Sequence, residues 1–347
     1  MAGKNHRVGK SLIEVQRAFG TDEQCQAYLE AARWPEGVRC LKCDGEKVSK
    51  FTTNETSRER LNRKGQIVVS KVPARHLYEC LSPECGYQFS ATTGTLFNDT
   101  HLPLTKWFLA VAVMCNAKKG VSAKQLERDL GVNYRTAWYL AHRIRKAMEE
   151  GNLWGEKMSG TIEADETYVG GKYDRRLQRP RWDKEPVFGM IERNKPGKPS
   201  QVRAYHVPQV NRFSFYGKIK ENVIADAELI VTDEAHLYKS LGKHFKRHEI
   251  VNHSAKQWIR GEVHTQSIEN FWSLFKRGVI GSYHKVSIKH LDRYLAEFCY
   301  RFNGRQNEEL FAMTILALVI AAKMSYAQLI GKTSEPARPS EHEDAPF

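Results

Sequence analysis

The sequence predicts a multidomain α+β protein with a metal-binding ribbon near its N-terminus. Two cysteine pairs lie in a turn-rich stretch, two helical runs separated by a glycine follow, and short β-branched runs then alternate with turns before helical periodicity returns. We expect an N-terminal helical segment, a zinc ribbon, a helix–turn–helix, an α/β domain, a C-terminal helical segment and a disordered tail, with these bounds: 1–35, 36–98, 99–150, 158–305, 306–330 and 331–347.

The composition combines globular character with a positive charge. The 347 residues contain 54 Lys and Arg against 40 Asp and Glu, a formal net charge of +14. This balance favours nucleic acid over a membrane as the polyanionic partner, because neutralised phosphates release condensed counterions. The longest apolar run, 311–322, is shorter than the roughly 20 residues of a bilayer-spanning helix. The 7 cysteines, without a leader-like segment, favour a reducing cytoplasm.

Four cysteines at two short spacings predict a structural zinc site. Cys40 and Cys43 form a CxxC turn, and Cys80 and Cys85 form a second, longer knuckle. Two such turns present the four thiolates that tetrahedral Zn²⁺ prefers, and they leave no open coordination position for catalysis. The alternative is a set of unrelated buried thiols, which is the interpretation that we give to the other three cysteines.

The segment between the cysteine pairs is rich in cations. Residues 50–77 contain seven lysines and arginines against two glutamates. We expect a basic β-hairpin or loop on the zinc scaffold, with Arg63 and Lys64 as candidates for phosphate contact. A solvated edge without a partner is the alternative.

Residues 121–148 predict two helices that meet at Gly131. Ser122 is a candidate N-cap for the first helix, and the second begins near Tyr134 and ends near Met148. An ordinary helical hairpin would share this pattern. We expect the second helix to point five side chains away from its apolar face, as a recognition helix does in the major groove: Arg135, His142, Arg143, Arg145 and Lys146.

Three carboxylates predict a divalent metal site. The β-like run TIEAD ends at Asp165 and the run ELIVTD ends at Asp233. A carboxylate at the end of a buried strand costs desolvation unless a cation or hydrogen bonds compensate. Glu269 lies early in a helix with apolar residues at i, i+3, i+4 and i+7, and Lys276 follows on the same stripe, about 10 Å along the axis. Taken singly, each acid would be interpreted as a strand-end cap or a solvated charge.

Such a set of acids suits phosphodiester chemistry. Two metal ions ~3.5–4 Å apart can activate an attacking hydroxyl and stabilise the leaving oxygen. Hard oxygen ligands favour Mg²⁺, with Mn²⁺ as a substitute. We therefore expect two such ions, with Asp165 and Asp233 close together and Glu269 completing the second position.

At these residues the sequence resembles the bacterial insertion-sequence transposases of the DDE type that carry an N-terminal zinc ribbon. The resemblance covers most of residues 36–303. It rests on six stretches that follow one another in family order: 85–108, 122–138, 164–172 (ADETYVGGK), 231–238 (VTDEAHLY), 248–259 and 264–303.

The resemblance implies a ribonuclease-H-like catalytic domain with a mixed five-stranded sheet flanked by helices. It also implies that Asp165, Asp233 and Glu269 form the catalytic triad, followed by the basic residue Lys276. The third acidic position varies within the family, so two neighbours remain alternatives there: Gln266 and Asn270.

The resemblance further implies the reaction and the partners. Enzymes of this kind bind terminal inverted repeats, hydrolyse a phosphodiester at the element's end and use the freed 3′-hydroxyl to attack target DNA. Synapsis of two ends implies a homodimer or a higher assembly, working on double-stranded DNA in the bacterial cytoplasm, in association with the nucleoid. Further cations would hold phosphates: Lys239, Lys243, Lys246, Arg247, Lys256, Arg260 and Arg277.

Two other functions remain open. One is a domesticated transposase without catalysis that serves as a sequence-specific DNA-binding regulator. The other is a nuclease of the same fold that cuts without joining.

Overall fold

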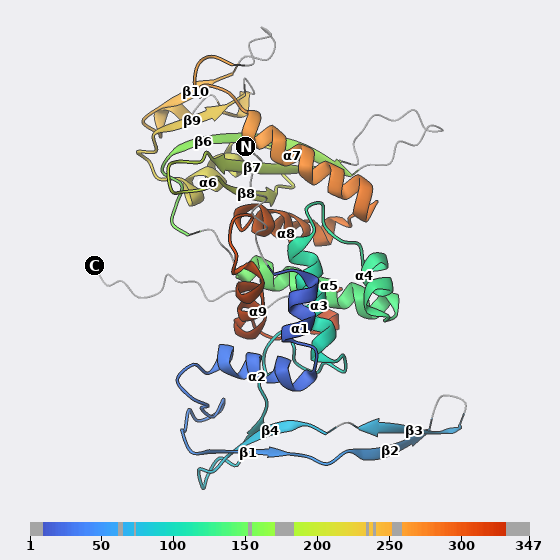
Figure 1. The fold of residues 1–347 in the computed structure, drawn as a ribbon. Helices are drawn as coiled ribbons and strands as arrows, with labels where there is room; N and C mark the ends of the chain where they lie inside the picture. The colour runs from blue at the N-terminus through green and yellow to red at the C-terminus, as the bar shows by residue number, and fades with distance from the viewer. Residues whose placement is uncertain are drawn as a thin grey trace, which may run out of the picture.

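The structure is a computed structural model. Figure 1 shows three tiers: the cysteine-containing strands at one end, a helical unit in the middle and a larger sheet with its helices at the other end. The expected tail, 331–347, lies outside the described residues, as do Arg63 and Lys64. The residues that the structure describes are 10–61, 65–72, 74–151, 155–170, 184–233, 236–238, 241–251 and 259–330.

A small antiparallel sheet carries the cysteines. Its strands, in the order in which they pair, are β1 (Val48–Thr52), β4 (His76–Cys80) and β5 (Gln88–Phe89). Beyond β1 and β4 the chain continues as β2 (Thr56–Leu61) and β3 (Ile67–Val72), which pair as a two-stranded arm extending away from the helices (Figure 1). The arm is the expected β-hairpin, and the side chains of β2 are all exposed because two strands alone enclose no core.

The helical unit is built from both ends of the chain. Phe19, Phe108 and Phe311 belong to one buried core cluster, and the rings of Phe19 and Phe311 stack with centroids 5.7 Å apart. The helices that enclose this core are α1 (Leu12–Ala18), α2 (Asp22–Arg33), α3 (Leu104–Asn116), α4 (Ala123–Leu130), α5 (Tyr134–Glu150), α9 (Leu310–Ile320) and α10 (Tyr326–Leu329).

Helices α4 and α5 meet at Gly131, as predicted. Ser122 caps α4 by accepting a hydrogen bond from the backbone N–H of Gln125. Gly131 then adopts a left-handed conformation with φ 58°, which glycine reaches without a Cβ penalty. Asn133 caps α5 through its side-chain oxygen. The turn between the two helices is therefore set by local residues.

The third tier contains a mixed five-stranded sheet. Its strands are β6 (Thr161–Gly170), β7 (Lys184–Glu192), β8 (Gln201–His206), β9 (Leu229–Thr232) and β10 (His248–Ile250), in the spatial order β10-β9-β6-β7-β8. Strands β6, β7 and β8 pair antiparallel, whereas β9 pairs parallel with both β6 and β10. The mixed sheet matches the expectation from the sequence, and it places β6 at the centre.

Helices cover both faces of this sheet. On one face, α6 (Arg212–Asn222) packs through Phe215 and Ile219. On the other, α7 (Gln266–Gly278) and α8 (Leu291–Asn303) enclose a second core. Short helical turns complete this tier: η1 (His236–Tyr238), η2 (Leu241–Lys243), η3 (Val279–Tyr283), which is π-helical, and η4 (Ile288–His290). Among the described residues, no helix has both the length and the apolarity that crossing a bilayer requires.

Candidate functional site

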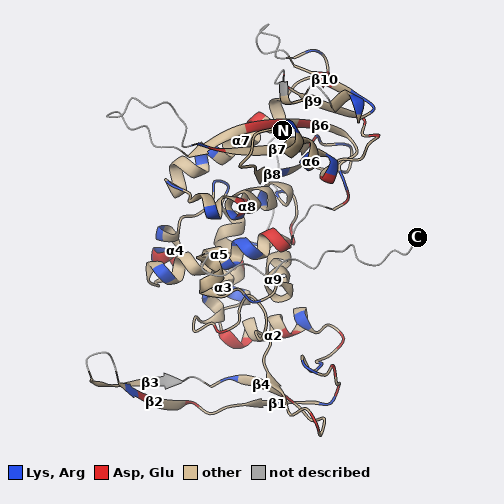
Figure 2. Cartoon of the chain, turned by 180° about the vertical axis from the view of Figure 1, so that it is seen from behind, with Lys and Arg blue, Asp and Glu red and all other residues tan. Residues whose placement is uncertain are grey.

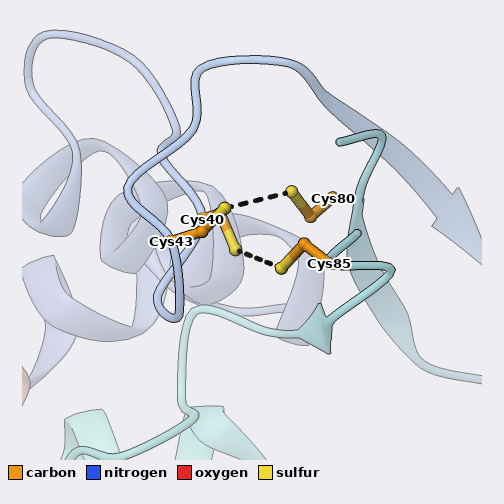
Figure 3. A group of neighbouring side chains, drawn as sticks. All are labelled: Cys40, Cys43, Cys80 and Cys85. Carbon is orange, nitrogen blue, oxygen red and sulfur yellow. Dashed lines mark hydrogen bonds between the residues drawn. The ribbon is translucent and has the colours of Figure 1, made fainter. Parts of the chain in front are cut away.

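The four predicted ligand cysteines meet in one cluster. Their sulfur atoms all lie within 4.8 Å of one another. The Sγ atoms of Cys40 and Cys85 are 3.7 Å apart, and those of Cys43 and Cys80 are 3.5 Å apart (Figure 3). A tetrahedral site with Zn–S bonds of about 2.3 Å requires sulfur atoms about 3.8 Å apart. The donor set therefore fits one structural Zn²⁺.

The loops around the cluster are shaped for close approach to the sulfurs. A Cβ on Gly45 would lie 3.3 Å from Cys43 Sγ and 3.1 Å from Ser82 Oγ, so a larger residue would crowd the site. Hydrogen bonds from Ser82 lower the pKa of the Cys80 thiol to about 6. The deprotonated form, which is the one that binds metal, is therefore favoured at Cys80.

The remaining cysteines are core thiols, as predicted. Cys25 and Cys299 are fully buried. Burial raises the pKa of both thiols to about 12 and that of Cys115 to about 11. They stay protonated at neutral pH, and none belongs to the four-cysteine cluster.

The sheet register places Asp165 next to Asp233. Strands β6 and β9 run parallel, with Glu163 paired to Val231. Asp165 stands two residues further along β6, on the same face as Glu163 because side chains alternate along a strand. It lies within the strand, not at its end as predicted, because β6 continues to Gly170. Asp233 directly follows the last residue of β9. Acidic residues accordingly mark β6 and the start of α7 in the charge-coloured view (Figure 2).

Asp165 is held by a tryptophan from α7. The indole Nε1 of Trp272 donates a hydrogen bond to Asp165 Oδ2 over 3.1 Å. The cross-strand partner of Asp165 on β7 is Gly189, where a Cβ would come within 2.5 Å of the Trp272 ring. Glycine at this position therefore makes room for the indole that contacts the aspartate.

The pKa of Asp165 indicates that the candidate acids lie close to one another. Burial, followed by the charges of Glu166, Asp233 and Glu269, raises the pKa of Asp165 to about 7. Such repulsion operates only between carboxylates that lie close to one another. A bound divalent cation would relieve it.

Glu269 stands in the first turn of α7 and accepts a hydrogen bond from Thr265 Oγ1 over 2.8 Å. Its side chain is exposed, whereas the predicted apolar stripe of α7 is buried throughout. The oxygens of Asp165, Asp233 and Glu269 do not all lie within 4.8 Å of one another; within the described part of the chain the four cysteines are the group that meets this criterion. The acids thus surround one region without forming a closed cluster.

Comparison with known proteins assigns the cysteine cluster and the region of the three acids to known domains. Residues 20–88 match the family model of the transposase zinc-ribbon domain, and residues 157–303 match that of the ISXO2-like transposase domain. The chain is also 25% identical over 303 residues, 82% of this chain and 92% of the other, to a Halobacterium salinarum protein described as an uncharacterized protein in transposable element ISH50.

The chain belongs to the insertion-sequence transposases with an N-terminal zinc ribbon. In this transposase the cysteine cluster lies within the matched ribbon, and Asp165, Asp233 and Glu269 lie within the matched transposase domain. Helices α3, α4 and α5 stand between the two matched segments.

The expected exposed face of α5 is largely buried in the transposase. His142, Arg143 and Arg145 are 0%, 7% and 2% exposed, so the prediction that they point away from the packed side of the helix is wrong. Helix α5 is the central helix of its unit and is contacted by α4, α8 and α9. A helix surrounded in this way has no broad solvent-facing side.

Each of these buried side chains contacts a partner inside the protein. Arg145 pairs with Glu297 of α8, and Arg143 donates to the carbonyl of Asn98 and to the Tyr139 hydroxyl. The His142 ring packs against the rings of Trp138, His290 and Tyr294. These residues join helices, and they offer no surface to DNA.

The side chains of the other two predicted DNA-contacting residues of α5 are exposed to solvent to different degrees. Arg135, at the start of α5, is exposed and lies over the ring of Tyr326. Lys146 is 12% exposed and pairs with Glu149 and Glu150. Arg135 is therefore the remaining candidate for DNA contact on this helix.

The predicted phosphate-binding cations of the sheet tier are surface residues where they are described. Lys243, Lys246, Lys276 and Arg277 are exposed. Arg247 and Arg260 are paired with Glu262 and Glu249 respectively. Lys239 and Lys256 lie outside the described side chains.

The sequence pattern missed one part of the site. The spacing of Trp272 predicted its burial, which the structure confirms at 4% exposure, but not its hydrogen bond to Asp165. The signal that was present in the sequence was Gly189 in an otherwise bulky strand, since glycine inside a strand often marks close approach of another group.

Proposed function

We propose that this transposase cuts DNA at the ends of its element and joins the freed 3′-hydroxyl to target DNA, using Asp165, Asp233 and Glu269. The mixed five-stranded sheet with helices on both faces supports a ribonuclease-H-like catalytic domain. The matched transposase domain, which contains all three acids, supports the reaction class.

The observation that carries the proposal is the proximity of Asp165, on β6, to Asp233, which directly follows the neighbouring parallel strand β9. Two carboxylates held this close repel each other, and the raised pKa of Asp165 reflects that cost together with burial. Oxygen donors with this charge suit two Mg²⁺ or Mn²⁺ ions, which when bound would polarise the phosphodiester and lower the pKa of a nucleophilic water or hydroxyl.

The protein's own side chains orient the site. The Trp272 indole donates a hydrogen bond to one carboxylate oxygen of Asp165, which leaves the other oxygen available as a metal ligand. The hydroxyl of Thr265 holds Glu269 in the same way. Lys276 and Arg277 are exposed in the last turn of α7, where they can bind the phosphates that flank the scissile bond.

DNA binding is proposed for two regions outside the sheet tier. We propose that α4 and α5, which meet at Gly131, act as a helix–turn–helix; the exposed Arg135 at the start of the second helix supports this. The β2–β3 arm carries exposed Arg58 and Arg60 on the same face, because they are two residues apart. Arg63 and Lys64, between these strands, extend the charged sequence.

The expected partners and location follow from the same chemistry. Bringing together two terminal inverted repeats favours a homodimer or a higher assembly. The working compartment is then the bacterial cytoplasm, at the nucleoid.

The test is a reaction with zinc-loaded protein, Mg²⁺, a target plasmid and labelled DNA from the sequences that flank the coding region. Joined product supports the transposase, cleavage alone favours the nuclease, and a gel shift without cleavage favours the regulator. Asp165→Asn should abolish cleavage and joining while DNA affinity stays within about threefold of wild type. Cleavage by Asp165→Asn at the wild-type rate would reject the assignment of the acids.

A further inference from the structure

Glu163 is a fully buried carboxylate that faces α7 from the central strand. It lies on β6 two residues before Asp165, on the same face of the sheet, and is 0% exposed. A charge buried this deeply is costly unless several donors compensate it. The groups that surround it therefore indicate what it does.

The carboxylate of Glu163 caps the N-terminus of α7. Its Oε2 accepts hydrogen bonds from the backbone N–H groups of Ser267, over 2.7 Å, and Ile268, over 2.9 Å. The local N-cap, Thr265, makes no capping hydrogen bond, because its hydroxyl is directed to Glu269. A residue 104 positions before Ser267 in the sequence thus supplies the cap that the helix lacks locally.

Arg193 fastens the loop before α7 to the same carboxylate. Its Nε donates to Glu163 Oε1 over 2.6 Å. Its two terminal nitrogens donate to the backbone carbonyls of Glu262 and His264. Glu163 and Arg193 together form a bracket that fixes the start of α7 against the strand that carries Asp165.

The bracket determines where Glu269 stands. Glu269 follows the capped residue Ile268 directly, so a shift of the first turn of α7 moves Glu269 relative to Asp165. We infer that Glu163 is a positioning residue that sets the distance between the two metal-binding acids. This inference rests on the proposed function, because it presupposes that Asp165 and Glu269 bind the same metal centre.

The experiment compares Glu163→Gln with a matched control, Glu192→Gln. Glu192 is also buried, at 2% exposure, and also caps backbone N–H groups, those of Ser159 and Gly160, while pairing with Lys198. These contacts lie just before β6. Glu192 is paired with Ile162, so its side chain lies on the opposite face of the sheet from Glu163 and α7. Both substitutions should lower the melting temperature, but they should differ in metal binding.

The measurement is a Mn²⁺ titration of the zinc-loaded full chain, followed by electron paramagnetic resonance of the free ion, together with the Mn²⁺ dependence of strand cleavage. Glu163→Gln should raise the Mn²⁺ dissociation constant by about 10–100-fold, and high Mn²⁺ should restore part of the cleavage rate. Glu192→Gln should change the dissociation constant less than twofold. DNA affinity should remain at the wild-type value in both variants.

Equal Mn²⁺ affinity in Glu163→Gln and wild type would overturn the inference, and so would an equal loss in both variants, which would indicate a merely structural role. If Glu163→Gln does not fold, Arg193→Lys tests the same bracket, because lysine loses the forked contacts to the loop; unchanged Mn²⁺ affinity there also overturns it. Asp165→Asn distinguishes failure of the proposed metal centre from failure of the positioning role of Glu163. If Asp165→Asn does not change Mn²⁺ binding, the proposed metal centre is rejected, and the inference with it.

Discussion

The Nε atom of Arg145 on α5 lies 2.7 Å from the Glu297 carboxylate on α8, and both side chains are 2% exposed or less. This ion pair joins the helical unit to the tier that carries the candidate acids. Glu297 also accepts a hydrogen bond from Tyr283 and pairs with Arg301. Although burial opposes it, the two arginines hold the pKa of Glu297 below its ordinary value. The pair therefore remains ionised inside the protein.

Removing one member of this pair should be costly. Arg145→Leu leaves Glu297 buried with fewer compensating charges, and we expect the free energy of unfolding to fall by about 3 kcal/mol. Urea denaturation measures this loss. The matched control is Lys146→Ala at the next position, where the contacts to Glu149 and Glu150 lie nearer the surface and the loss should be about 1 kcal/mol or less. Similar losses in both variants would contradict the structural role of the buried pair.

The cysteine cluster predicts the zinc content of the protein. Cys40→Ser removes one of four sulfur ligands, so elemental analysis should find the bound zinc strongly reduced after dialysis. Cys25→Ser is the control, because Cys25 is a buried thiol outside the cluster and its loss should leave zinc unchanged. Full zinc retention in Cys40→Ser would show that this thiol is not a ligand.

The raised pKa of Asp165 predicts a stability that depends on pH. The folded chain holds the Asp165 proton more tightly than the unfolded chain, so this proton adds to the free energy of unfolding. The contribution is fully present below pH 3.8, the ordinary pKa of an aspartate. It is lost as the pH rises toward about 7. In Mg²⁺-free buffer at pH 8, Asp165→Asn should therefore be more stable than wild type by about 1–2 kcal/mol. Near pH 4 the difference should vanish.

Thermal denaturation of zinc-loaded protein at several pH values between these limits measures the effect. Addition of Mg²⁺ should reduce the difference at pH 8, because a bound cation offsets the repulsion in the wild type only. A variant that is less stable than wild type at pH 8 would count against close packing of the acids.

The lowered pKa of His142 predicts that the stability of the fold changes with pH in the opposite direction. Burial lowers the pKa of its ring far below 6.5, and neither ring nitrogen has a hydrogen-bond partner among the described residues. Because the pKa is lower in the folded state, the neutral ring contributes to the free energy of unfolding above pH 6.5, and this contribution is lost as the pH falls. Between pH 7 and pH 5 we expect the free energy of unfolding to fall by about 2 kcal/mol less in His142→Phe than in wild type.

Urea midpoints at the two pH values provide this comparison. His101→Phe is the control, because His101 is exposed and its replacement should not alter the acid sensitivity. Equal acid sensitivity of His142→Phe and wild type would place the responsible group elsewhere.

The features that the sequence predicted well are those with local signals. The CxxC turn at Cys40 brings two ligands together within four residues. The β-like run before Asp233 ends where β9 ends, as the sequence predicts. Asp165 was expected at a strand end too, but β6 continues to Gly170 and places it within the strand. Both kinds of pattern determine the backbone geometry of a few neighbouring residues, so they do not depend on contacts with distant parts of the chain.

The features that the sequence did not predict depend on partners far away in the chain. The charged side of α5 looked solvent-facing because nothing near Arg145 indicates that Glu297 will cover it 152 residues later. Likewise, the periodicity of α7 buried Trp272 correctly, but the direction of its indole N–H depends on the space left by Gly189 of β7. Glu163 resembles an ordinary strand residue until α7 is placed against it.

The two-ended construction of the helical unit affects how the protein is made. Leu318 and Phe311 of α9 pack into the core that begins with Phe19, and the backbone N–H of Leu96 donates to the carbonyl of Leu318. During synthesis the N-terminal helices emerge first, yet their core stays incomplete until α9 has left the ribosome. The sheet tier, lying between them in the chain, can fold earlier, so the ribosome releases a protein whose first-made helices are among the last to become fully buried.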